Sequence, residues 1–267
     1  MIHTTLSTVL DVFSAGFFAV IGIFILGRQR RESYSRPMNL FGVWWILLGA
    51  IKAIEIFIRI MMYDYGITAL NVPMYSIYWT IGPIATFCLL YYTLFLFTGH
   101  EKWRIPIIVF YAAIIIAIVA VILTSGPYVA LDDAPFYLNQ PGNIAYAKPV
   151  PDYLALLIIG AIEVPQISVC IALYSLYRKM EKPTQKYRLV MVATSLLLIF
   201  VSGFVSFIAG KTDELAWETV YRAIYLLSAI LVYVAYRPPY SIRRKYGVMS
   251  ILEEKSGEKS SSANSSE

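Results

Sequence analysis

Three ionisable residues, Lys52, Glu55 and Arg59, lie inside an apolar segment that extends from Met38 to Met62. Successive residues of an α-helix turn by about 100°, so spacings of three and seven residues place the three side chains on one helix face. A charge at the centre of a bilayer costs roughly 2.5–3.5 kcal/mol on insertion scales, so this face should lie against protein. Charged residues inside membrane segments often line ligand and ion pathways, which makes the face a candidate binding site.

The composition places the whole chain among integral membrane proteins. Of its 267 residues, 58% are hydrophobic and only 15% are charged. The mean hydropathy is +0.64. Such values are typical of membrane-spanning rather than soluble chains. The pI near 9.0 does not indicate a nucleic-acid partner, because the Lys and Arg residues lie at the ends of apolar segments rather than along one basic element. The lipid bilayer is the expected partner.

Seven apolar segments are long enough to span a bilayer as helices. Together they predict an all-α integral membrane protein, a seven-transmembrane-helix bundle within residues 1–239. The remaining residues, 240–267, are predicted to form a tail that begins as an amphipathic helix over 240–254 and then becomes disordered. The seven segments are residues 6–26, 38–62, 74–97, 106–123, 153–176, 189–210 and 216–236. The long connection 124–152 is predicted to form an ordered cap or a plain loop on one side.

Basic residues favour one side of the membrane. Lys and Arg are concentrated in four connections, 27–37, 99–105, 177–188 and 237–267. These hold 17 Lys and Arg residues, whereas the opposite side has only Lys148 and Lys211. Because basic loops remain in the cytoplasm, the N-terminus is predicted outside and the C-terminus in the cytoplasm, with the protein in the plasma membrane.

Ionisable residues of other segments lie at heights that match those of the second segment. With a rise of about 1.5 Å per residue from the middle of each segment, each cation has a carboxylate near its own height. The expected pairs are Lys52 with Glu163, Glu55 with Arg222 and Arg59 with Glu218, while Asp11 is placed to reach Arg59 or Arg222.

These charges allow two interpretations. A buried ion network can serve only to set the register and orientation of the helices. Alternatively, it lines a polar site that is reached from outside, and the location of every charge in the outer half favours this second interpretation. The candidate residues for binding a ligand or proton are Asp11, Lys52, Glu55, Arg59, Glu163, Gln166, Glu218 and Arg222.

Other chemistries are not expected from this sequence. It has no Asp-rich metal motif, nucleophile elbow or histidine pair, so neither an enzyme nor a metal site is predicted. Cys88 and Cys170 fall inside apolar segments. The topology resembles that of G-protein-coupled receptors and microbial rhodopsins, but a retinal Schiff base needs a lysine in the seventh segment, and residues 216–236 contain none. No cofactor is therefore expected.

The dipeptide Pro165-Gln166 resembles the Pro-Gln motif of the PQ-loop transporters. These are seven-helix carriers made of two three-helix repeats joined by a linker helix, and the uniformly apolar fourth segment, which we expect at the periphery, is similar to that linker. The first segment lacks a matching Pro-Gln. The resemblance implies a secondary transporter that uses Glu163 and the charges of the second, fifth and seventh segments as a proton or substrate site.

The function predicted first is that of a receptor-like or sensory membrane protein. A small polar ligand or a proton would enter from outside and compete for one ion pair of the charged cluster. The helices that carry the pair would shift. The basic inner loops and the tail would then pass the change to a cytoplasmic or membrane protein partner.

Overall fold

A computed structural model describes residues 2–32, 36–61, 71–125, 157, 159–212 and 215–248 of the chain. The described part is 94% helix and contains no strand. Within it, seven helices are long and apolar enough to cross a membrane. The protein is thus a membrane-type helical bundle, as the sequence predicts.

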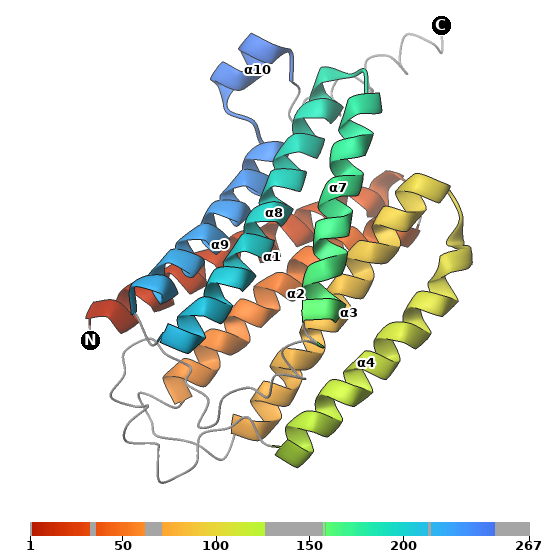
Figure 1. Cartoon of the computed structure of the whole chain (residues 1–267). Coiled ribbons are helices and arrows are strands. Elements are labelled where there is room, and N and C mark those ends of the chain that lie inside the picture. The colour runs from red at the N-terminus through yellow and green to blue at the C-terminus, as the bar shows by residue number, and fades with distance from the viewer. Residues whose placement is uncertain are drawn as a thin grey trace, which may run out of the picture.

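Each predicted segment corresponds to one long helix (Figure 1). The helices are α1 (Ile2–Glu32), α2 (Arg36–Arg59), α3 (Asn71–Thr98), α4 (Arg104–Ser125), α7 (Val164–Lys179), α8 (Pro183–Thr212) and α9 (Leu215–Tyr236). A 3₁₀ turn, η2 (Glu101–Trp103), precedes α4, and a π-helix, η4 (Ile159–Glu163), leads into α7. A short helix, α10 (Tyr240–Tyr246), follows α9.

Several helices extend beyond the predicted apolar segments. α8 begins at Pro183 rather than at residue 189, because proline suits the first turn of a helix and the following Lys and Arg residues sustain it. α10 is shorter than predicted: Gly247 adopts a left-handed conformation with φ of 62° and ends the helix. The connection 126–156 and the tail 249–267 lie outside the described residues.

Six of the seven helices form a closed ring. α1, α2 and α3 pack in chain order, as do α7, α8 and α9, while α9 closes against α1 and α3 against α7. α4 packs mainly on α3, at the outer edge of the bundle (Figure 1). The expectation that the apolar fourth helix is peripheral is confirmed. Side chains that point into the ring are therefore shielded by α1, α2, α3, α7, α8 and α9.

α1 and α2 approach closely through glycines. A Cβ placed on Gly22 would lie 2.5 Å from Cγ1 of Ile46 and 2.7 Å from the carbonyl oxygen of Gly42. A Cβ on Gly49 would lie 3.0 Å from the carbonyl oxygen of Ala15. Small residues at membrane helix interfaces allow backbones to meet in this way, and dispersion contacts then hold the helices together.

Substitution of Gly22 by alanine is expected to destabilise the bundle by roughly 1–3 kcal/mol, because the new methyl group meets the backbone of Gly42 and forces α1 and α2 apart. Gly16 is the matched control, since a Cβ there has nothing within 4 Å. The Gly16→Ala variant should be neutral or slightly more stable through its higher helix propensity. Thermal unfolding of both variants in detergent measures the difference, and equal melting temperatures would contradict the prediction.

Aromatic side chains fill the ring in the half where α2 begins. We call Phe18, Phe41, Trp44, Trp45 and Tyr92 the aromatic layer; they belong to α1, α2 and α3. Ring centroids are 4.1 Å apart for Trp44 and Trp45, 4.6 Å for Phe41 and Tyr92, and 5.5 Å for Phe18 and Trp45. Phe18, Trp44 and Trp45 are fully buried. The bundle is therefore densely packed at this level.

Candidate functional site

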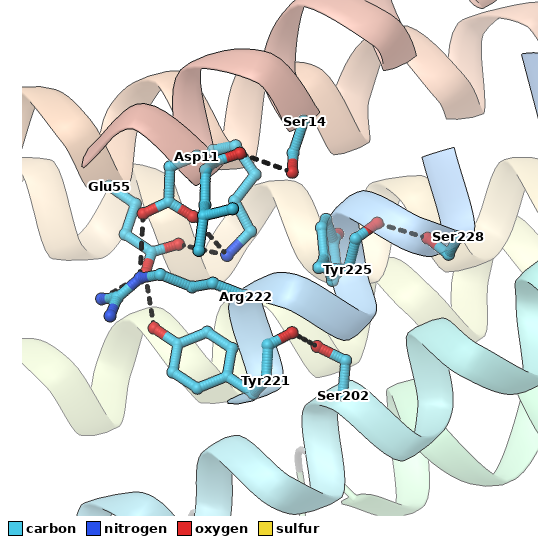
Figure 2. A network of polar contacts seen from close by, with 10 residues as sticks. Asp11, Ser14, Glu55, Ser202, Tyr221, Arg222, Tyr225 and Ser228 are labelled. Carbon is cyan, nitrogen blue, oxygen red and sulfur yellow. Dashed lines mark hydrogen bonds and ion pairs between the residues drawn. The ribbon is translucent and has the colours of Figure 1, made fainter. Parts of the chain in front are cut away.

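Four charged side chains from three helices meet inside the ring. Asp11 comes from α1, Glu55 from α2 and Arg222 from α9 (Figure 2). Lys52 also belongs to α2. We call these four residues the charged tetrad. None is more than 4% exposed, and Asp11 is completely buried. The sequence argument that intramembrane charges should face protein rather than lipid holds for all four.

The tetrad alternates in charge. Lys52 Nζ lies 2.7 Å from Glu55 Oε2 and 3.5 Å from Asp11 Oδ1. Arg222 Nε lies 3.0 Å from Asp11 Oδ2, and its Nη2 lies 3.6 Å from Glu55 Oε1. Each carboxylate thus contacts both cations, and the two positive charges balance the two negative ones. Such mutual compensation is what offsets the large desolvation penalty of buried ions.

Two tyrosines of α9 complete the surroundings of the tetrad. The Tyr221 hydroxyl donates a hydrogen bond to Glu55 Oε1 at 3.0 Å. The Lys52 ammonium lies 4.5 Å from the ring centroid of Tyr225 and 5.2 Å from that of Tyr221. Arg222 Cζ lies 4.8 Å from the Tyr221 ring. These cation–π contacts stabilise positive charge where water is excluded.

Serine hydroxyls of α8 donate hydrogen bonds to α9, the helix that carries Arg222. Ser202 donates to the carbonyl oxygen of Tyr221 at 2.8 Å (Figure 2). Ser195 donates to the carbonyl oxygen of Ser228 at 2.9 Å. Polar side chains bonded across membrane helices stabilise the packed pair. Movement of α9 would therefore be transmitted to α8.

The structure tests some of the expected ion pairs. The Glu55–Arg222 and Asp11–Arg222 contacts are confirmed. The expected Lys52–Glu163 pair is wrong, because Lys52 contacts Asp11 and Glu55 instead. The reason is that α1 is a direct neighbour of α2 in the ring, whereas α7 is not. The backbones of Arg59 and Glu218 belong to α2 and α9, and their side chains lie outside the described part of the chain.

Glu163 and Gln166 lie where η4 joins α7, so they come from a different part of the chain than the tetrad. The Glu163 carboxylate faces α8: a Cβ on Gly203 would lie 2.6 Å from its Oε1 and 3.4 Å from its Oε2. Gln166 is only 5% exposed. Glu163 Oε2 and Gln166 Oε1 are both buried and have no hydrogen-bond partner among the described residues. Buried oxygen acceptors without donors are uncommon in native proteins and call for an explanation.

The backbone next to Glu163 is irregular because of Pro165. Proline has no N–H, so the carbonyl of Ala161, four residues earlier, loses the donor it would have in an α-helix. The Tyr111 hydroxyl of α4 donates to that carbonyl at 3.0 Å. The sequence analysis missed this role of Tyr111, although a single tyrosine in the apolar fourth segment was the available signal. π-turns inside helices are frequent at functional sites.

Among the described residues, no group of three or more His, Cys, Asp or Glu side chains is arranged to hold a metal ion. The polar groups that meet inside the bundle are instead suited to ion pairing and hydrogen bonding. No protein-family model matches the chain, and no curated protein or solved structure is significantly similar to it. The seven apolar helices and the buried charges together define a class, a multi-pass membrane helical bundle.

Proposed function

We propose that this protein is a receptor-like membrane sensor that binds a small polar ligand or a proton from the outer side. The observation that carries the proposal is the position of the charged tetrad directly above a packed aromatic layer. On α2, Lys52 follows Trp45 by seven residues, a rise of about 10 Å. A polar site that ends on tightly packed rings suits detection of a ligand better than its passage through the bundle.

The mechanism follows from the charge balance of the tetrad. Protonation of one carboxylate, or its capture by a ligand, leaves two cations facing a single carboxylate. Lys52 and Arg222 would then repel each other across α2 and α9, and these helices would separate until the charges were compensated again. Because α1 and α2 also carry the aromatic layer, the shift would reach the opposite, basic end of the bundle, where a protein partner is expected.

A secondary transporter is the alternative, and one observation favours it. The buried oxygens of Glu163 and Gln166 lie beside the π-turn and Pro165, at a point where α7 departs from regular helical geometry. Discontinuous helices with polar groups near the midplane are typical of carriers. In that case Glu163 would bind the transported proton or substrate.

Reconstitution into liposomes that contain a pH-sensitive dye distinguishes the two functions. For a sensor, an external pH step should change the tryptophan emission, because Trp44 and Trp45 lie in the aromatic layer, while proton flux should not exceed that of empty liposomes. The titratable and charged groups that face one another here are the tetrad, Tyr221 and Tyr225. The emission change should disappear in the double variant Lys52→Met/Glu55→Gln, which retains the balanced Asp11–Arg222 pair.

Glu181 provides the control, since it is exposed between α7 and α8. The Glu181→Gln variant should respond as the wild type does. Proton uptake well above the background of empty liposomes, abolished by Glu163→Gln, would instead establish the carrier and overturn the sensor.

A further inference from the structure

We infer that Glu163 and Gln166 form a binding site for a single positive charge, carried by a sodium ion or by a primary ammonium group. The inference goes beyond the proposed function, because it adds a second site and names the charge of its ligand. It concerns a different place in the bundle from the charged tetrad, namely the junction of η4 and α7 opposite Gly203.

Each of the two side chains has an oxygen acceptor that receives no hydrogen bond from the described residues. Glu163 is the last residue of η4 and Gln166 lies in the first turn of α7, a spacing of three residues that places both on one helix face. Their oxygens Oε2 and Oε1 are buried without a hydrogen-bond partner in the described part of the chain. An unsatisfied buried acceptor costs about 1–3 kcal/mol, and more where it is charged. A bound cation removes this penalty at both atoms.

The charged tetrad does not provide the missing charge. Lys52 and Arg222 form ion pairs with Asp11 and Glu55, and the charges of these four residues cancel. When it is ionised, Glu163 therefore adds one negative charge that the tetrad does not compensate. The site calls for a ligand of charge +1 rather than for a neutral or anionic one.

The Glu163 carboxylate packs directly against the backbone of α8. Gly203 of α8 has no side chain, and any Cβ there would meet Glu163 Oε1 at 2.6 Å. One carboxylate and one amide oxygen suit a monovalent ion or an ammonium group, which has three donors. Divalent ions such as Ca²⁺ take six to eight oxygen ligands, usually with several carboxylates, so they fit poorly.

Thermal unfolding of the full chain in detergent tests the site, with sodium chloride, methylammonium chloride and choline chloride compared at equal ionic strength. Sodium or methylammonium should raise the melting temperature in a saturable way, since a ligand that binds only the folded state stabilises it. Choline, which has no N–H donor, should not. A response to sodium alone identifies a metal ion, and a response to methylammonium alone identifies an amine ligand.

Three variants sharpen this test. Glu163→Gln should weaken binding by roughly 100-fold and Gln166→Leu by roughly 10-fold, in line with the loss of a charged and of a neutral acceptor. Without ligand, Glu163→Gln should be at least as stable as the wild type, because it removes an uncompensated buried charge. Glu181→Gln, in the exposed connection, should bind as the wild type does.

The outcomes separate this inference from the proposed function. If no cation raises the melting temperature but the tryptophan emission still changes on a pH step, the cation site is overturned and the sensor remains. If a cation binds saturably and this binding requires Glu163, while a pH step causes no emission change, the cation site is supported and the sensor is contradicted. Binding that survives Glu163→Gln overturns the inference.

Discussion

Replacement of Arg222 by methionine is expected to lower the free energy of unfolding by roughly 3–5 kcal/mol. Arg222 is 1% exposed and contacts both Asp11 and Glu55. Methionine preserves much of the side-chain volume but leaves two carboxylates to share Lys52. The buried region then carries an uncompensated negative charge that bulk solvent does not reach. At about 2–4 °C per kcal/mol for chains of this size, the melting temperature should fall by roughly 10 °C.

The double variant Asp11→Asn/Arg222→Met provides the decisive comparison. It removes one charge of each sign and keeps the 2.7 Å contact between Lys52 and Glu55. If charge balance holds the tetrad together, the double variant should recover more than half of the stability that Arg222→Met loses. The coupling energy between the two positions is obtained from the four melting curves of the cycle. If the stability losses of the two single variants add up to that of the double variant, the two residues act independently.

Replacement of Phe18 by alanine is expected to lower the free energy of unfolding by roughly 3 kcal/mol. The Phe18 ring is fully buried and packs on Trp45 and Tyr225, with centroids 5.5 Å and 5.3 Å away. Its removal leaves an empty volume between α1, α2 and α9. The effect lies at the low end of the range for such substitutions, because lipid or detergent rather than water surrounds the opened helices.

Phe13 is the matched control on the same helix. It is 55% exposed and points away from the ring. The Phe13→Ala variant should change the unfolding free energy by less than about 1 kcal/mol. Unfolding of both variants in detergent measures the contrast. Similar losses at the two positions would mean that the aromatic layer does not hold these helices together.

The charged tetrad and the aromatic layer are coupled because they share helices. α1 carries Asp11 and Phe18, α2 carries Lys52, Glu55 and the two tryptophans, and α9 carries Arg222. A change in the charged tetrad therefore acts on helices that also carry or contact the rings of the aromatic layer. For the proposed sensor, this shared support is the physical route from the outer half of the bundle to its basic end, and Phe18→Ala should weaken the emission response as well as stability.

The number and approximate extent of the membrane helices were determined by the sequence. In a bilayer each backbone N–H and C=O must be satisfied within its own segment, so every long apolar run becomes a helix. The burial of Asp11, Lys52, Glu55 and Arg222 was determined in the same way, because charges are costly in lipid. Helix rise alone was enough to place Glu55 and Arg222 at one height.

Only the tertiary structure decided which charges meet. Helix rise predicts Glu163 at the height of Lys52, but the order of helices around the ring places Asp11 of α1 beside Lys52 instead. That order depends on contacts such as the close approach at Gly22 and Gly42, which join residues distant in sequence and carry no periodic signal. Glu163 is consequently left with Gln166 at the start of α7. The spacing of Glu163 and Gln166 is a local pattern, but the absence of Glu163 from the ion pairs of Lys52 follows from packing between helices.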